Sequence, residues 1–534
     1  MIGPYTAFKF EPDVSIDTYR IRWQTALETA KDHCMALRRL RAATEVAACY
    51  EDLNDFEVLI NGADTTGSIW KALHPDIIFR NEAEKAAKAF VVLKSEMYAS
   101  SGIAENITLL EAVAPSKGLD AARLLEVWKK NLRQGGAYLK PEAKKEAQRL
   151  TIAIQDVMEE YRDNMRQDKQ HLELTLSELY GVPEDYLVTH PINCETGKVR
   201  VNYSRSDVGP VLDYCQIQAT REKVFRMSNN QASPANERVL RRLLDLRQDK
   251  ATMLGYENWA QCQLEGTMAK TTQTVLDFLD DMYEVIRPRV QKEIREITEL
   301  LKDQDNIDAH AWDMQYGSTR LKRRLFPGFD VKEMRQYFLV DKVLPAVRKI
   351  AEDMFCLRFE ETHTFAWYPT VTSYLVFDKA KGEEVLLGRL FFDVFRREGK
   401  VDGASAHTVS SAVVDRQLAE VILVASLQHQ PAACMSLLEV RSILHELGHC
   451  VHALVGKQRY VQLAGTATHR DFVEAPSQML ELVFTDKKLF DFAVNAKGER
   501  IPDEMLDKLL ASSDVGQGLR ENNSLVLAHY SVRA

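Results

Sequence analysis

The sequence is poor in cysteine, and the cysteines that it has are scattered. Eight occur in 534 residues, and no two of them form a C-x-x-C pair. A disulfide framework would cluster its cysteines in a short secreted chain, so this usage is typical of a reducing compartment. The first residues, MIGPYTAFKFEPDVSID, carry early acids and contain no basic region followed by an apolar stretch. We therefore predict a cytoplasmic protein without a secretory signal or transit peptide.

Long apolar runs and long basic runs are also missing. The most apolar run, VILVASL at 421–427, is far too short to span a bilayer. The densest basic cluster, LKRRLF at 321–326, is typical of a solvated helix end, and the formal net charge is −9. The apolar share of 45% is ordinary for a globular protein. We expect neither a membrane nor a nucleic acid as a partner.

What the first 360 residues do contain is helical periodicity. In the segment 141–165, apolar residues recur at spacings of three and four and form one stripe, with charged residues elsewhere. The stripe consists of Leu150, Ile154, Val157, Tyr161 and Met165. Similar stripes occur in 17–63, 81–98, 236–254 and 273–302. We predict that residues 1–360 form a mostly helical N-terminal region.

The pattern changes after about residue 360. The segments SYLVF (373–377) and VLLGRLFFDVF (385–395) are rich in β-branched, aromatic and leucine residues, and DKAKGEE between them has turn character. This arrangement predicts a β-hairpin, and AEVILVASLQ (419–428) predicts a further strand. Two helices are expected to follow, the second beginning near 471–481. We predict a second region over 361–534, with a small sheet beside these helices.

The first of these helices carries the motif H-E-x-x-H. His445 and His449 are four residues apart, so both imidazoles lie on one face and can reach one Zn²⁺. Glu446 then lies beside the metal and can accept a proton from water. Gly448 leaves room for another chain segment to approach closely. The alternative is a helix whose histidines bind no metal, but buried imidazoles without a partner would be costly.

A zinc site needs a third protein ligand, and the sequence offers two candidates. The H-x-x-G-x-x-H continuation of metzincins is absent, because His452 and Val455 stand at its Gly and final His positions. His452 shares the helix face, but it would have to share a metal with a histidine two turns away. Glu474, 25 residues past His449, suits a His₂Glu site on a returning helix. We prefer Glu474 and keep His452 as the alternative.

Glu481 lies seven residues beyond Glu474, on roughly the same helix face. It is either a surface charge or the group that holds a ligand imidazole in the correct tautomer. Cys450 follows His449 but points away from the zinc face, so we expect a packed thiol.

The segment HELGHCVHALVGKQRYVQLAGTATHRDFVEAPSQMLE (445–481) closely resembles the zinc-helix region of the thimet oligopeptidase family, which includes neurolysin and the saccharolysin-type enzymes. The segment FFDVFRREGK (391–400) resembles that family's strand and turn beside the active site. Weaker similarity occurs at ALHPDIIFR (72–80), LDLRQDKATMLGYENWA (244–260) and AWDMQYGSTRLK (311–322). The resemblance covers nearly the whole chain.

The resemblance implies a mainly α, two-lobed metallopeptidase whose lobes interleave along the chain and flank a deep channel. His445, His449 and Glu474 would bind one Zn²⁺ per chain, and Glu446 would be the general base. The segment RYVQLAGT (459–466), with Tyr460 and Gly465, would form a mobile substrate loop over the channel.

By this resemblance, residues 361–534 form the catalytic region and the function is zinc-dependent hydrolysis of short peptides, as in an oligopeptidase. We expect a monomer. Two departures are visible. After REGK this chain has Val401–Ala404 where the family usually runs aromatic, Gly, His, Ala, and the family's C-terminal segment with a His and several tyrosines is not found before Ala534. The alternative function is therefore a catalytically weak or inactive peptide-binding homologue.

Overall fold

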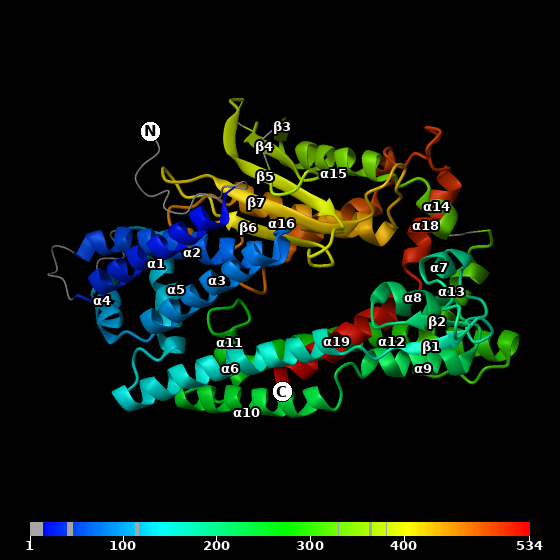
Figure 1. Ribbon diagram of the computed structural model, residues 1–534, viewed down its shortest axis with the longest axis horizontal. Helices are drawn as coiled ribbons and strands as arrows, with labels where there is room; N and C mark the ends of the chain where they lie inside the picture. The colour runs from blue at the N-terminus through cyan, green and yellow to red at the C-terminus, as the bar shows by residue number, and fades with distance from the viewer. Residues whose placement is uncertain are drawn as a thin grey trace. The chain divides into compact units, whose positions relative to one another are not determined.

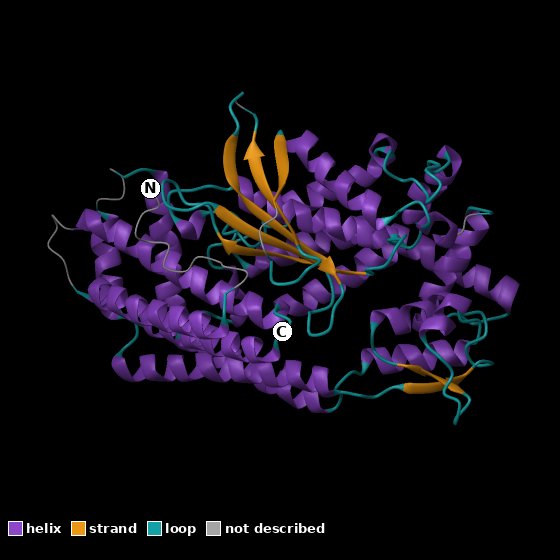
Figure 2. Ribbon diagram, turned by 45° about the horizontal axis from the view of Figure 1, so that its top comes forward, coloured by secondary structure: helices purple, strands orange, loops and turns teal. Residues whose placement is uncertain are grey.

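The computed structural model describes residues 14–39, 46–112, 117–328, 331–362, 366–380 and 382–533. Helices dominate these residues, and the named strands lie in two sheets, as Figure 2 shows. The prediction of a mainly α fold with a small sheet beside the His-bearing helix is thereby confirmed. Residues 1–13, which carry most of the stretch behind the prediction of no targeting segment, lie outside the described residues.

The chain divides into two compact units, each built from three separate segments. The first unit comprises residues 1–148, 265–270 and 332–501, and the second comprises 149–264, 271–331 and 502–534. The predicted division near residue 360 coincides with the start of the strands of the larger sheet. As a domain boundary it stays a prediction, and so does the channel between two lobes.

Long amphipathic helices open the first unit (Figure 1). They are α1 (Ile16–Arg38), α2 (Val46–Leu73), α3 (Ile77–Tyr98), α4 (Ser101–Glu111) and α5 (Leu119–Gly135). Their apolar stripes meet in one core that includes fully buried Trp70, Phe90 and Trp128. The stripe predicted over 17–63 falls on α1 and α2, two separate helices.

A five-stranded sheet lies beside these helices. Its strands are β3 (Leu357–Thr362), β4 (Thr372–Asp378), β5 (Val385–Phe395), β6 (Ser405–Ser410) and β7 (Ala419–Leu427). Their spatial order is β3-β4-β5-β7-β6, with β5 and β7 parallel and the other pairs antiparallel. The hairpin of β4 and β5 and the strand at 419–427 confirm the predictions, whereas β3 and β6 were not predicted.

The sheet is covered on more than one side. Phe391, Ile422 and Val424 belong to the same buried cluster as the helices α1–α5. The helix α16 (Leu437–Val455) packs against β5, β6 and β7 and against α15 (Val340–Phe355). Burial of both faces explains why β7 is an almost continuous apolar run instead of an alternating one.

The remaining elements of the first unit are short. They are α14 (Val331–Arg335), α17 (Ala475–Glu481) and the 3₁₀ helices η3 (Val461–Leu463), η4 (Leu482–Thr485) and η5 (Lys487–Phe490).

The second unit is helical apart from one short antiparallel pair, β1 (Leu172–Thr175) with β2 (Lys198–Val201). Its longest helix, α12 (Thr272–Asp305), packs on α13 (Met314–Leu325) and α19 (Gln517–Arg533). Its other helices are α6 (Pro141–Gln167, which starts in the first unit), α7 (Glu184–Thr189), α8 (Arg205–Tyr214), α9 (Gln218–Asn229), α10 (Ala235–Met253), α11 (Trp259–Leu264), η2 (Ala311–Asp313) and α18 (Asp503–Ser513). The helices predicted at 141–165, 236–254 and 273–302 are confirmed as α6, α10 and α12.

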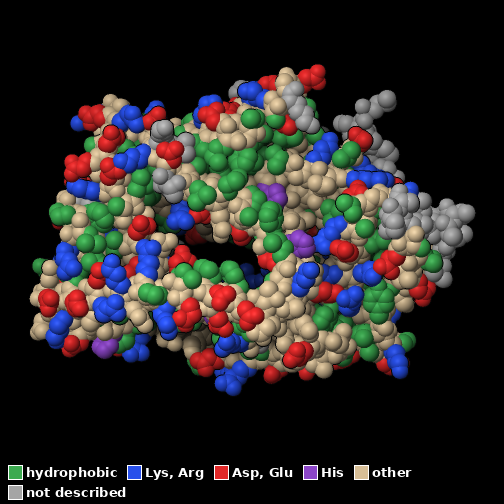
Figure 3. Space-filling view, turned by 180° about the vertical axis from the view of Figure 1, so that it is seen from behind, with side chains coloured by type: hydrophobic (Ala, Val, Ile, Leu, Met, Phe, Trp, Pro, Cys, Tyr) green, Lys and Arg blue, Asp and Glu red, His purple; other side chains and the backbone are tan. Residues whose placement is uncertain are grey.

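No helix in the described part of the chain is long and apolar enough to cross a membrane. On the face drawn in Figure 3, acidic and basic side chains are intermingled. The absence of a nucleic-acid partner stays a prediction.

Candidate metal centre and active site

The helix α16 carries the H-E-x-x-H motif and is fixed at its start by a capping box. The Ser436 hydroxyl accepts a hydrogen bond from the backbone N–H of Glu439 at 3.2 Å, and the Glu439 carboxylate accepts one from the Ser436 N–H at 2.6 Å. Apolar residues on its other faces, such as Ile443 and Leu447, are buried. Cys450 is fully buried too, which confirms the prediction of a packed thiol, and burial raises its pKa well above the usual value.

His445, His449 and Glu474 come together at this helix. Glu474 Oε2 lies 3.2 Å from His445 Nε2 and 3.1 Å from His449 Nε2. The potential ligand atoms of the three side chains all lie within 4.8 Å of one another. Two ligands bound to one tetrahedral zinc at roughly 2.0–2.1 Å would be about 3.3 Å apart, so this spacing suits the ion. The Glu474 side chain is 53% exposed, so the group is open to solvent on one side.

Hydrogen bonding determines which atom of His445 faces that group. His445 Nδ1 lies 2.6 Å from Glu481 Oε1, and Arg441 pairs with the other carboxylate oxygen of Glu481. Because a carboxylate only accepts hydrogen bonds, the Nδ1 atom must carry the proton. In the neutral ring, Nε2 then presents a lone pair to the carboxylate of Glu474. Two acceptors at this distance require a cation or a second ring proton between them, so the donor set fits a metal ion.

A glycine brings Glu474 within reach of the two histidines. A Cβ atom on Gly448 would lie 2.6 Å from Ser477 Cα and 2.9 Å from Pro476 O, which is closer than packed atoms approach. The predicted close approach at Gly448 is therefore confirmed, and the approaching segment is the first turn of α17. Ser477 Oγ donates to the Glu474 backbone carbonyl and lies 3.0 Å from Glu474 Oε2.

Glu446 lies next to the three-residue group and contacts the edge of the sheet. Burial raises the pKa of its carboxyl group, the two histidines and the backbone N–H of Ala406 oppose this rise, and Glu474 adds to it. Ala406 is on β6, so the backbone of this edge strand lies beside the Glu446 carboxylate. The sequence does not predict this contact, because any residue type can supply a backbone N–H and because hydrophobic and polar residues alternate only weakly along β6.

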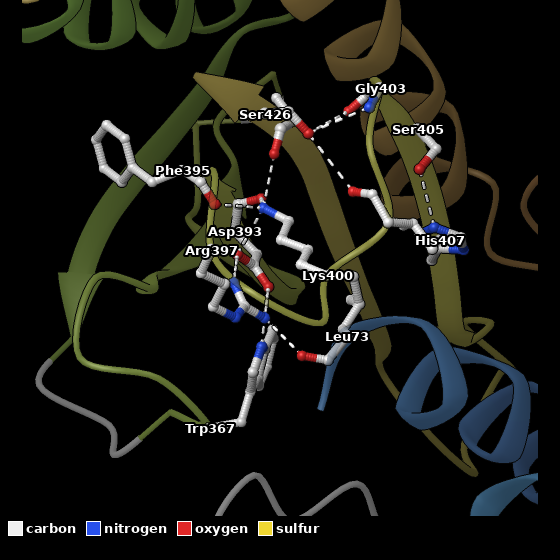
Figure 4. A network of polar contacts seen from close by, with 12 residues as sticks. Leu73, Trp367, Asp393, Phe395, Arg397, Lys400, Gly403, Ser405, His407 and Ser426 are labelled. Carbon is white, nitrogen blue, oxygen red and sulfur yellow. Dashed lines mark hydrogen bonds and ion pairs between the residues drawn. The ribbon is translucent and has the colours of Figure 1, made fainter. Parts of the chain in front are cut away.

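A buried ionic network lies at the end of β5 and in the loop that follows it (Figure 4). The side chains of Asp393, Arg397 and Lys400 are 0, 5 and 1% exposed. The Lys400 ammonium donates to Asp393 Oδ1 at 2.9 Å and to the backbone carbonyls of Phe395 at 2.9 Å and Ala425 at 2.6 Å. It thereby ties the ends of β5 and β7 together.

The other members of the network complete the pairing of Asp393. Arg397 forms two hydrogen bonds with the carboxylate and a third with the Leu73 carbonyl, and Trp367 Nε1 donates to Asp393 Oδ2 at 2.9 Å. Burial alone would raise the Asp393 pKa, but Arg397 and Lys400 outweigh it and hold the pKa below its usual value. The network lies within FFDVFRREGK, the segment predicted to lie beside the active site, though its individual roles were not predicted.

Other residues singled out in the sequence lie elsewhere. His452 is not part of the metal-binding group in the described residues, and its Nδ1 is buried without a hydrogen-bond partner there. Tyr460 is fully buried, 6.2 Å from the ring of Tyr50. Gly465 has a φ of +59° and donates to the Gly456 carbonyl at 2.7 Å. The assignment of Tyr460 and Gly465 to a substrate loop stays a prediction.

Comparisons with known proteins agree with the motif. Residues 211–531 match the model of Peptidase family M3. The chain is 28% identical over 380 residues to "Probable thimet oligopeptidase" of Arabidopsis thaliana, covering 70% of this chain and 52% of the relative. It is 28% identical to saccharolysin of Saccharomyces cerevisiae, covering 67% and 54%.

A solved structure titled "PZ PEPTIDASE A with inhibitor 2" matches with a TM-score of 0.48 and 12% identity, over 99% of this chain and 75% of that one. This chain spans about half the length of the curated relatives that it matches. With the family model matching more than half of its residues, the chain belongs to Peptidase family M3.

Proposed function

We propose that the protein is a zinc-dependent endopeptidase that hydrolyses short peptides. The observation that carries the proposal is the group of His445, His449 and Glu474 with the carboxylate of Glu446 beside it. Two imidazoles and one carboxylate form a ligand set of catalytic zinc sites, which keep an open position for water or substrate. Membership of a peptidase family supports the same reaction.

The side chains divide the work in a definite way. His445, His449 and Glu474 would hold one zinc ion per chain, which, when bound, supplies a Lewis acid that polarises the scissile carbonyl. Glu446 accepts a proton from the attacking water and delivers it to the nitrogen of the leaving amine. Glu481 holds the His445 ring with its Nε2 atom toward the group.

The edge strand β6 supports a peptide as the substrate. It is the last strand of the sheet, so one row of its backbone groups is not paired by another strand of the five. An extended peptide can add to such an edge through main-chain hydrogen bonds. Because Ala406 of β6 contacts Glu446, a peptide on this edge would run past the general base.

Cleavage of a quenched-fluorescence peptide library tests the proposal. We expect zinc-loaded protein to cleave short peptides, a chelator to abolish cleavage, and zinc to restore it. Glu446→Gln should keep its zinc and its peptide affinity and lose about 10²–10⁴ in rate, because the amide cannot accept the proton. Equal rates for the two proteins at equal zinc content would remove Glu446 from the mechanism.

The same assay separates the enzyme from the alternative function. If neither protein cleaves any peptide while both bind peptides, the protein is a peptide-binding homologue instead of an enzyme. The cytoplasmic location and the monomeric state stay predictions from the sequence.

A further inference from the structure

A cavity opens along the C-terminal part of β6. It has a volume of about 420 Å³ and is walled by α2, α3, α5, η3 and the C-terminal part of β6. All of these elements belong to the first unit. Thr408, Val409 and Ser410 of β6 line it. These residues are two to four positions beyond Ala406, or about 7–13 Å at the usual rise of a strand.

The most deeply buried charged group that lines this cavity is the carboxylate of Glu57, on α2. Glu57 is only 2% exposed. Its carboxylate accepts a hydrogen bond from the hydroxyl of Tyr98 at 2.9 Å, and the side chain of Gln462 lies near it. Asn131 in turn donates to the Tyr98 hydroxyl at 3.3 Å. Burial raises the Glu57 pKa, although Lys94 opposes the rise.

The cavity also contains a hydrogen-bond acceptor that no described donor satisfies. The side chain of Gln462 lines the cavity, and its oxygen Oε1 is buried with no hydrogen-bond partner among the described residues. The ammonium of Lys94 also lines the cavity, but it is paired with Asp64 at 2.8 Å. The cavity therefore combines a buried carboxylate with an unsatisfied carbonyl oxygen, and burying either without a donor is costly.

We propose that this cavity, the Glu57 pocket, receives an arginine side chain of the bound peptide. A guanidinium offers five N–H donors in a planar fork and a positive charge, which is what a carboxylate and a second acceptor at one site require. Because the Glu57 pocket lies two to four residues beyond Ala406 along β6, the arginine would be two to four residues from the cleaved bond of the peptide. The proposal rests on the proposed function, because it takes the peptide to lie along β6.

A peptide series tests this pocket on the zinc-loaded, full-length protein. One arginine is moved residue by residue along an otherwise constant quenched peptide, and each version is paired with one that carries citrulline, the neutral isostere. We expect kcat/KM to favour arginine by about ten- to hundredfold at one position two to four residues from the cleaved bond, as a hydrogen bond to a buried charge implies. Elsewhere in the peptide the ratio should stay near one.

Variants assign the preference to the pocket. Glu57→Gln should remove the preference for arginine, and its circular dichroism spectrum and thermal unfolding show whether the variant is folded. Gln462→Met, which lacks the unsatisfied oxygen, should reduce the preference. Glu105→Gln removes one exposed acidic charge from α4 and should leave the preference intact. An unchanged arginine-to-citrulline ratio in Glu57→Gln, or no preference in the unmodified protein, overturns the proposal.

Failure of the enzyme itself gives a different result. If no peptide of the series is cleaved, the ratio of dissociation constants for fluorescently labelled arginine and citrulline peptides is measured by anisotropy with the same variants. A ratio near one in the unmodified protein refutes the pocket. A ratio of about ten or more that Glu57→Gln abolishes supports the pocket while the endopeptidase proposal fails.

Discussion

Removing the carboxylate of Glu481 should weaken zinc binding although Glu481 is not a ligand. Its Oε1 atom lies 2.6 Å from His445 Nδ1 and holds the ring with Nε2 toward Glu474. Glu481→Gln keeps an acceptor of the same reach but loses its charge. A hydrogen bond to a charged group contributes about 1.5–3 kcal/mol and a neutral one about 0.5–1.5 kcal/mol, so the loss is roughly 1–1.5 kcal/mol, or five- to tenfold in affinity. Glu481→Ala removes the partner altogether and should cost about 10–100-fold.

The measurement is a competition for zinc between the protein and a chromophoric chelator at constant pH. Glu105→Gln is the control, because it removes an equal charge at an exposed site on α4. The expected order of affinity is unmodified protein and control, then Glu481→Gln, then Glu481→Ala. If Glu481→Ala binds zinc with an affinity within about twofold of that of the unmodified protein, the Glu481 carboxylate does not orient His445 for metal binding.

Three further changes test neighbouring contacts. Glu474→Ala should lower zinc affinity by more than the roughly 10–100-fold expected for losing Glu481, which only orients a ligand. His452→Ala should have little effect. The reverse order in the same competition assay would make His452 the third ligand. Lys400→Met leaves Asp393 short of a buried cation and should lower the free energy of unfolding by about 3–5 kcal/mol in chemical denaturation, whereas a loss under about 1 kcal/mol would contradict the importance of the network. Gly448→Ala forces α16 and α17 apart, so we expect a loss of about 1–3 kcal/mol in unfolding free energy together with weaker zinc binding, and normal zinc affinity would contradict the role given to this contact.

Periodicity in the sequence located most of the long helices and the central strands. The stripe of α6 and the apolar runs of β5 and β7 are strong local patterns, because each follows from one buried face or from burial on both faces. The strand β6 has no buried residue except Val409 in its burial pattern, so no clear alternation marks it. Its place at the edge of the sheet depends on pairing with β7, which is a tertiary interaction.

The spacing within one helix also made the core of the candidate site predictable. His445, Glu446 and His449 lie within two turns of α16, so their relation follows from helix geometry alone. The sequence favours Glu474 over His452 as the third zinc ligand but does not establish the choice, because residue types do not reveal the path of the chain between the two helices. In the structure that path is governed by the close contact of Gly448 with α17.

The sequence by itself determined the local chemistry: a helix with two imidazoles and a carboxylate at spacings that suit zinc, within a mainly helical chain. Tertiary structure decided which groups meet this helix from elsewhere. It brought Glu474, the residue before α17, Glu481 from the end of α17 and the Ala406 backbone from β6 to this helix. It also closed the cavity around Glu57 from four helices and one strand. The reason is physical, since periodicity reports only which face of an element is buried, whereas the partner on that face is determined by close packing and hydrogen bonding between distant segments.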